Sequence, residues 1–260
     1  MRSAQSFVSR AARRNVVDEE IHCEARKWPV RLQPHSPFEQ MVDRLARDKD
    51  MRVAGFNPTS EAIGDTKWLE LARLAAEADE RMEALHDAVK AVHAAEPLAK
   101  VLVFAPLQGF SKAKKAVERL GERLKMITEV ITPGKDQEEA AEKVLRFDEP
   151  PLEASYRNKC RVMLLAYEDG AGLNLQHGCH HVVLYAPLAG SGHDQEQIIG
   201  AVGKEQQSIG RVKRAGQMCT VTIHRIMLLD PGGQTTLDSE LCERNQRPEL
   251  VKTSTNVGDA

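Results

Sequence analysis

The sequence has few aromatic residues and almost no net charge. Phe, Trp and Tyr make up 4% of its 260 residues, so a hydrophobic core has to be built mainly from Leu, Val, Ile and Ala. The 36 basic and 38 acidic residues nearly balance. This balance excludes a protein that attracts nucleic acid through its overall field. Any contact with nucleic acid must therefore come from a local patch of positive charge.

Signals for disulfides, metal sites and membrane spans are also missing. The cysteines are odd in number, widely spaced and never form a CxxC pair: Cys23, Cys160, Cys179, Cys219 and Cys242. A reduced, intracellular setting is the simplest interpretation. No apolar run approaches the length of a membrane span. His177, His180 and His181 lie close to Cys179, but adjacent residues of a strand point to opposite faces, so we expect no metal site there.

From Lys100 onward, strand-like and helix-like segments alternate. Apolar runs predict strands at 101–105, 126–131, 161–166, 181–187 and 220–229. Amphipathic stretches predict helices at 111–124, with Ser111 as N-cap, at 136–147, and before the last strand. Such alternation is typical of parallel βαβ units with right-handed crossovers and helices on both faces. The sequence therefore predicts an α/β fold with a parallel sheet.

Four regions follow from these patterns. We expect residues 1–66 to be irregular or partly helical, with a short helix at 38–45, and residues 67–97 to form one long amphipathic helix. Residues 98–230 form the α/β lobe, and residues 231–260 a tail that is part helix and part disordered. The first 17 residues contain four arginines and no acid. They suit a basic segment of a nuclear protein or, alternatively, a mitochondrial presequence.

The segment Gln207–Gln217, QSIGRVKRAGQ, carries the clearest chemical signal. Arg211 and Arg214 are three residues apart, so on a helix they share one face. The planar guanidinium fork matches phosphate oxygens, which makes such a pair a candidate phosphate clamp. Taken alone, the same pair also fits a solvated basic helix face.

The whole string matches QxxGRxxRxGQ and resembles the last helicase motif of Swi/Snf-type superfamily-two DNA-dependent ATPases. Three further segments, KVLVFAP (100–106), GKDQEEAAEKVLRFDEPP (134–151) and VVLYAP (182–187), resemble other family motifs in the right order. Ala186 replaces an acid of the family pattern, and extra residues precede Gln207. The resemblance covers about residues 100–230 and implies a RecA-like helicase C-terminal lobe, of the P-loop NTPase-like fold.

The resemblance also implies roles for individual residues. Arg211 and Arg214 would be arginine fingers that reach the γ-phosphate of ATP, with Gln207 and Gly210 beside the nucleotide. The segment EDGAGLNLQ (168–176) resembles part of the family's motif five, although Asp169 departs from the pattern and one residue is missing. In this segment, Gly172 and Asn174 would contact the nucleotide, and Gly170 and Leu173 the nucleic acid.

A third segment, PLQGFSK (106–112), offers Gln108 and Lys112 to a nucleic-acid backbone. Ligands of open parallel sheets gather at the carboxyl ends of the strands, so we expect all three segments to lie at that edge.

A motor of this family also needs a GxxxxGK[ST] loop and an Asp-Glu pair for Mg²⁺, and this sequence has no such loop. We therefore expect half of an ATP-dependent DNA translocase or chromatin remodeller, inactive alone, with ATP and Mg²⁺ held by a first lobe in cis or in trans. The chain would be a fragment, a truncated product or a subunit that borrows that lobe, with duplex DNA as its track. Two alternatives stay open: a non-catalytic module that binds protein or nucleic acid, and an unrelated α/β enzyme such as a nucleotide-binding transferase.

Overall fold

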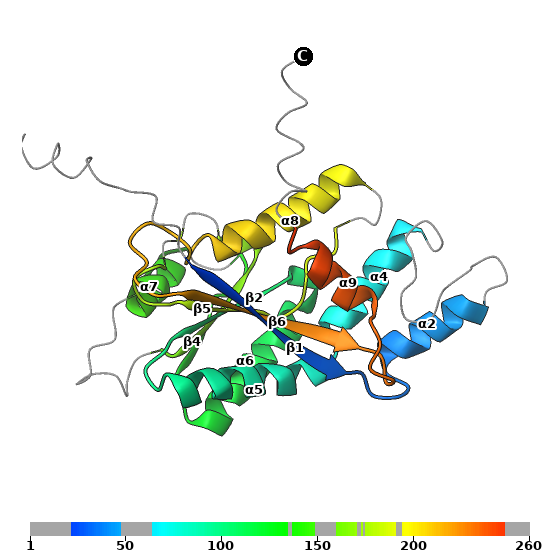
Figure 1. Ribbon diagram of the computed structural model, residues 1–260, viewed down its shortest axis with the longest axis horizontal. Coiled ribbons are helices and arrows are strands. Elements are labelled where there is room, and N and C mark those ends of the chain that lie inside the picture. Colours follow the sequence, from blue (N-terminus) through cyan, green and yellow to red (C-terminus); the bar gives the residue numbers. More distant parts are fainter. Residues whose placement is uncertain are drawn as a thin grey trace, which may run out of the picture.

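A six-stranded parallel sheet forms the centre of the protein (Figure 1). This computed structural model describes residues 22–47, 64–134, 137–148, 160–170, 173, 175–190 and 194–247. The strands are β1 (Cys23–Arg31), β2 (Val101–Ala105), β3 (Thr128–Val130), β4 (Val162–Ala166), β5 (His181–Leu184) and β6 (Val221–Leu229). Their order across the sheet is β1-β6-β5-β2-β4-β3, and all of these pairs are parallel. The predicted α/β fold with a parallel sheet is confirmed.

Helices cover both faces of the sheet. The helices are α2 (Pro37–Arg47), α4 (Asp65–Ala76), α5 (Glu80–Ala95), α6 (Phe110–Leu124), α7 (Gln137–Asp148), α8 (Gln195–Ile209) and α9 (Leu237–Arg244). Short 3₁₀ turns follow β2 (η2, Leu107–Gly109) and β4 (η4, Glu168–Gly170). Helices α5 and α6 pack on one face, α7 and α8 on the other, and α2, α4 and α9 form a third core beyond the sheet's carboxyl edge. Burial on both faces explains why β2 and β4 are uninterrupted apolar runs and why β5 is apolar after His181.

The predicted long helix over residues 67–97 is in fact two helices. Helix α4 ends at Ala76 and α5 begins at Glu80. The apolar stripe keeps its spacing across the break, so hydrophobic periodicity alone cannot reveal it. The break lies beside Arg81, whose Nε atom donates a hydrogen bond of 2.8 Å to the carbonyl oxygen of Ala75. Ending α4 there lets Arg81 enter the core.

The N-terminal region holds a strand where we expected irregular or helical structure. Strand β1 pairs along its whole length with β6, with Cys23 opposite Val221 and Arg31 opposite Leu229. It is an edge strand, and most of its residues, CEARKWPVR, are exposed. Charged residues and a proline are typical of edge strands and hide the usual apolar signal. The short helix expected at 38–45 is present as α2.

Five buried polar residues fasten the carboxyl edge of the sheet, and we call them the carboxyl-edge clasp: Arg81, Glu205, Arg225, Asp238 and Asn245. Arg81 pairs with Asp238 and donates to the carbonyl oxygens of Tyr185 and Ile226 at 2.7 and 3.1 Å. Glu205 accepts from Arg225 Nη1 at 2.8 Å and from Asn245 Nδ2 at 2.5 Å. These contacts tie α5, α8 and α9 to the strand ends.

The described part of the tail, residues 231–247, contains one helix, α9, flanked by turns. Helix α9 begins with a capping box in which Thr236 and Ser239 bond reciprocally. The proposed cap at Ser111 is wrong, because α6 begins one residue earlier and its N-cap position is Gly109. Residues 1–21 and 248–260, which carry the expectations about localisation and disorder, lie outside the described residues. Within the described ranges, no helix has the length and apolarity needed to cross a membrane.

Candidate functional site

The two arginines lie in a turn, and the prediction that they sit on a helix is wrong. Helix α8 ends at Ile209 with Gly210 as its C-cap. The next eight residues, Gly210–Gln217, fold into successive tight turns, and we call this segment the arginine turn. Its backbone bonds include Arg211 N to Ser208 O at 3.2 Å and Gln217 N to Arg214 O at 3.0 Å. Gly216 has a φ of 96°, which side-chain-bearing residues rarely adopt, so a glycine closes the turn.

The arginine turn lies at the amino edge of the sheet, opposite the edge that we expected. Helix α8 carries the chain back from the carboxyl end of β5 to the amino end of β6. Two hydrogen bonds fix the turn there. Gln217 Nε2 donates to the carbonyl oxygen of Cys179 at 2.9 Å, and Leu175 N donates to that of Arg211 at 3.0 Å. The expectation that ligand-binding segments lie at the carboxyl ends of the strands therefore fails for the arginine turn. Helix α8 ends at the opposite, amino edge of the sheet.

The side chains of Arg211 and Arg214 are both partly buried, and their charges lie close enough to interact. Arg214 Nε donates 2.9 Å to the carbonyl oxygen of Gly210, which holds this side chain against the turn. Arg211 Nε is buried and has no hydrogen-bond partner among the described residues. Burial and the positive charge of Arg214 lower the pKa of Arg211. A buried donor beside a like charge favours an anion, because an anion would satisfy the donor and screen the repulsion.

Of the other predicted nucleotide-binding residues, two join the arginines in one segment. Gln207 is exposed on the last turn of α8, and Gly210 is the C-cap whose carbonyl accepts from Arg214. Gly172 and Asn174 lie outside the described residues. The contact between Leu175 and Arg211 nevertheless brings the end of the segment 168–176 against the arginine turn.

The residues predicted to contact nucleic acid are not gathered at one place. Leu173 packs partly buried against the core under α7 and α8, and Gly170 ends η4 on the carboxyl side of β4. Gln108 and Lys112 follow β2, at the carboxyl edge. Lys112 pairs there with Asp79 at 2.6 Å. Their roles in nucleic-acid binding stay predictions.

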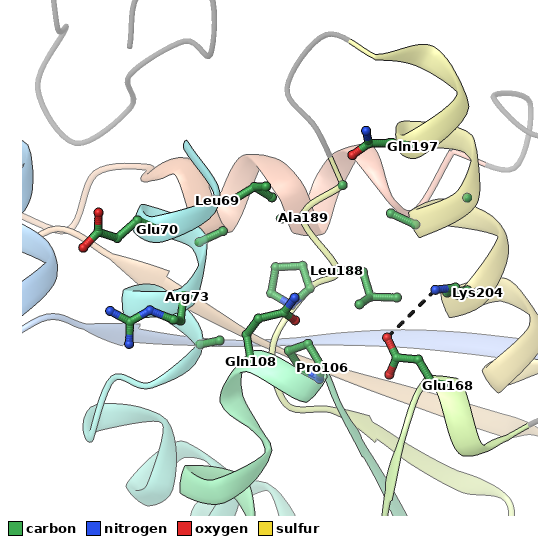
Figure 2. Close-up of a pocket in the computed structure, with 16 residues that line it drawn as sticks. Leu69, Glu70, Arg73, Pro106, Gln108, Glu168, Leu188, Ala189, Gln197 and Lys204 are labelled. Carbon is green, nitrogen blue, oxygen red and sulfur yellow. Dashed lines mark ion pairs between the residues drawn. The ribbon is translucent and has the colours of Figure 1, made fainter. Parts of the chain in front are cut away.

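A cavity of about 570 Å³ opens at the carboxyl edge (Figure 2). Residues that follow β2, β4 and β5 line it together with α4 and α8, among them Gln108, Glu168 and Leu188. Lys204 of α8 faces Glu168 at 4.0 Å, and the figure marks this ion pair. Arg73, also in the lining, pairs with Glu77 at 2.6 Å. These cations already have acidic partners, so this cavity is a weaker anion site than the arginine turn.

A second group of polar side chains lies near the turn, at the amino edge, and we call it the histidine cluster: Glu96, His180, His181 and His224. Glu96 is the C-cap of α5, and its carboxylate oxygens lie 2.7 Å from His180 Nε2 and 3.3 Å from His181 Nε2. His181 Nδ1 lies 3.3 Å from His224 Nε2. The indole of Trp28 donates 3.0 Å to His224 Nδ1. This set joins β1, β5, β6 and α5.

The argument that His180 and His181 face opposite ways is wrong. Strand β5 begins at His181, so His180 precedes the strand and the alternation of side chains does not hold for it. The two rings lie 4.4 Å apart between centroids. Burial, with a smaller effect of the neighbouring His180, lowers the pKa of His181 to about 4. Cys179 is turned into the core, and burial raises the pKa of its thiol to about 12.

Comparison with known proteins supports the fold through structure alone. The sequence matches no protein-family profile and no curated protein. The crystal structure of the C-terminal part of the Fun30 ATPase domain is 16% identical with a TM-score of 0.48, and covers 80% of this chain and 64% of its own. The Pyrococcus furiosus Hef helicase domain is 16% identical with a TM-score of 0.43, and covers 72% of this chain and 34% of its own.

The Sulfolobus solfataricus SWI2/SNF2 ATPase core, solved in complex with dsDNA, has a TM-score of 0.56 at 14% identity. The match covers 91% of this chain and 46% of that chain. This chain therefore spans about half the length of that core. At this level of identity the comparison shows the fold alone: the chain has a RecA-like fold similar to part of that ATPase core.

Proposed function

We propose that this chain is the C-terminal RecA-like lobe of a Swi/Snf-type ATP-dependent DNA translocase, and that its arginine turn binds the γ-phosphate of ATP held by a first lobe. The observation that carries the proposal is the paired guanidinium groups of Arg211 and Arg214. Both side chains are partly buried, and the buried Nε of Arg211 lacks a partner among the described residues. The pair lies within the string that resembles the last helicase motif.

The chemical task of the two arginines would be to neutralise charge on the phosphoryl group as it is transferred. A single arginine finger contributes about a thousandfold or more to the rate in related NTPases. The first lobe would hold Mg²⁺ and the β- and γ-phosphates, since this sequence has no loop for them. The bond from Leu175 N to Arg211 O would couple the turn to the loop before β5. Movement of that loop would then reach the arginines directly.

The proposed track is duplex DNA. The related SWI2/SNF2 core was solved with dsDNA bound, and Gln108, Lys112, Gly170 and Leu173 are the residues that we propose for contacts to it. Because the net charge is −2, such contacts would be local. A nuclear location, with chromatin as the site of action, belongs to the same proposal.

The test is ATP hydrolysis by the full chain, measured with and without duplex DNA and with and without an added Swi/Snf-type first lobe. We expect turnover only in the mixture, stimulated by DNA and lost in Arg211→Ala. Lys213→Ala is the matched control, because Lys213 is an exposed cation of the same turn and should leave turnover nearly unchanged. Hydrolysis by the chain alone, lost in Arg211→Ala, would overturn the proposal.

A second candidate is a non-catalytic lobe kept for binding. Two departures from the family pattern favour it. Ala186 is buried in the core beside α5, where the family has an acid, and its carbonyl accepts from the Tyr167 hydroxyl at 2.9 Å. Asp169 also departs from the family pattern, and burial raises the pKa of its carboxyl. If no mixture hydrolyses ATP but the chain still binds duplex DNA, this candidate would be favoured.

A further inference from the structure

Three metal-ligating side chains converge at the amino edge from two separate elements. Glu96 is the C-cap of α5, His181 begins β5, and His180 directly precedes that strand. One ligand atom from each lies within 4.8 Å of the others. Neither the predicted helicase chemistry nor the packing of the sheet requires two imidazoles and a carboxylate at this place. None of the three side chains belongs to the arginine turn.

We propose that Glu96, His180 and His181 form a binding site for a divalent cation of the zinc type. Two histidines and one carboxylate are a ligand set that leaves a fourth position of a tetrahedral zinc open. Ligand atoms around zinc lie about 3.3 Å apart, given bonds of about 2.0–2.1 Å. Two different oxygens of Glu96 lie 2.7 Å from His180 Nε2 and 3.3 Å from His181 Nε2. One ligand atom of each residue lies within 4.8 Å of the others, so the side chains have to move closer together around a bound ion.

The open position would face a cavity. Glu96 and His180 line a space of about 600 Å³ together with Gly216, Gln217 and Met218. The cation is therefore accessible to water and small ligands, next to the end of the arginine turn. The His181 ring is 5% exposed and closes the inner side of the site. The positive charge of Arg26 lies near enough to lower the pKa of His181, so it also repels a bound cation. This charge is paired with Glu24 at 3.6 Å.

The hydrogen bonds behind His181 give the site a distinctive signature. An indole N–H can only donate, so His224 Nδ1 accepts from Trp28 and the proton of a neutral His224 is on Nε2. That proton is donated to His181 Nδ1, and His181 Nε2–H is donated to Glu96. A cation on His181 Nε2 moves the ring proton to Nδ1, where it must donate to His224. His224 then carries its proton on Nδ1, opposite the Trp28 N–H.

Cation binding therefore reverses the tautomers of His181 and His224 and breaks the hydrogen bond of Trp28. Both rings stay neutral, so the reversal balances without net release of protons. Metal-bound histidines usually donate their second N–H to an acceptor, and here His224 fills that role only in the reversed tautomer. Binding of the cation therefore costs the protein the hydrogen bond between Trp28 and His224.

The test is titration of the metal-stripped full chain with Zn²⁺ by calorimetry, while tryptophan emission is recorded. We expect one Zn²⁺ per chain and a change in emission. Glu96→Gln and His180→Ala should each weaken binding by at least tenfold, about the loss that follows even when a supporting residue of a metal site is removed. His86→Ala is the matched control, because it removes a histidine of α5 that lies beside Asp87 and is not a proposed ligand. It should not alter binding. Equal affinities in wild type, Glu96→Gln and His180→Ala, or no saturable binding, would overturn the site.

A second variant tests the tautomer reversal. Trp28→Phe removes the donor that opposes the reversed tautomer, so Zn²⁺ should bind about fivefold more tightly, the ratio that one neutral hydrogen bond supplies. The emission change on binding should disappear in the same variant. Weaker or unchanged binding in Trp28→Phe would contradict the proposed link between the cation and the hydrogen bonds behind it. Thermal unfolding without metal shows whether each variant is folded.

Discussion

The two edges of the sheet both hold arginines, but they use them differently. At the carboxyl edge, Arg81 is fully buried and donates to Asp238 and to three backbone carbonyls. At the amino edge, Arg211 is half-buried, and its Nε atom has no partner among the described residues. Both positions desolvate a guanidinium, yet only the first satisfies it.

On the proposed function, this difference separates charges that hold the fold from charges that bind a ligand. A buried ion pair with complete hydrogen bonds holds elements in place, and losing one partner leaves the other charge uncompensated. A partly desolvated cation without a partner lowers the stability of the free protein slightly, and a ligand can recover that loss. The clasp should therefore control folding, and the arginine turn should control the binding of anions.

The largest expected effect is at the clasp. Glu205→Leu should lower the free energy of unfolding by about 3–5 kcal/mol, because it leaves the guanidinium of Arg225 buried without its carboxylate. Urea denaturation followed by circular dichroism measures this change. A loss below about 1 kcal/mol would show that water or rearrangement replaces the carboxylate, and the contrast between the two edges would fail.

The arginine turn should respond in the opposite way. Arg211→Ala should change the free energy of unfolding by less than about 0.5 kcal/mol and weaken tripolyphosphate binding by about tenfold, since a charge-assisted hydrogen bond is worth about 1.5–3 kcal/mol. Calorimetry at low salt measures the binding. Lys213→Ala, at an exposed position of the same turn, should weaken it by a smaller factor. Equal effects of the two variants would mean that only overall charge matters.

A smaller effect is expected where the turn is anchored. Gln217 joins it to the sheet through Cys179 O at 2.9 Å and accepts from Cys219 N at 3.0 Å. Gln217→Ala should cost about 1 kcal/mol of stability, the usual net value of a neutral hydrogen bond. It should also weaken tripolyphosphate binding, because the arginines lose their support. Full retention of binding would show that the turn is held by its backbone bonds alone.

The smallest effect is expected at a surface ion pair close to the clasp. Lys27 and Glu243 lie 3.1 Å apart, and both side chains are half exposed. Glu243→Gln should change the free energy of unfolding by less than about 0.5 kcal/mol, because solvent screens such pairs. This variant belongs in the same denaturation series as Glu205→Leu. A change as large as that of Glu205→Leu would remove burial as the explanation of the clasp.

The sequence predicts well the features that depend on local pattern. Buried strands such as Val101–Ala105 and Val162–Ala166 are uninterrupted apolar runs, and their alternation with helices predicts the parallel sheet that the structure shows. Edge strand β1 is missed because solvent covers most of it, and the break before Glu80 is missed because the apolar stripe continues across it.

The candidate site was harder to predict because it depends on distant contacts. The string around Arg211 identifies the arginines, but only the path of α8 places them at the amino edge. The histidine cluster is linked to Trp28 through His224, and these two residues are separated by 196 positions. No local pattern signals such a group, and the strand rule that argued against it fails because His180 precedes the strand.

The central claim is that Arg211 acts on a nucleotide held by another lobe and does little for the fold. It is tested most directly by the rate of DNA-stimulated ATP hydrolysis of Arg211→Ala mixed with a Swi/Snf-type first lobe, alongside its thermal midpoint. The account predicts a rate about a thousandfold below that of the wild-type mixture, with the midpoint unchanged. A rate equal to that of the wild-type mixture, or a rate that falls only as far as the folded fraction falls, would contradict it.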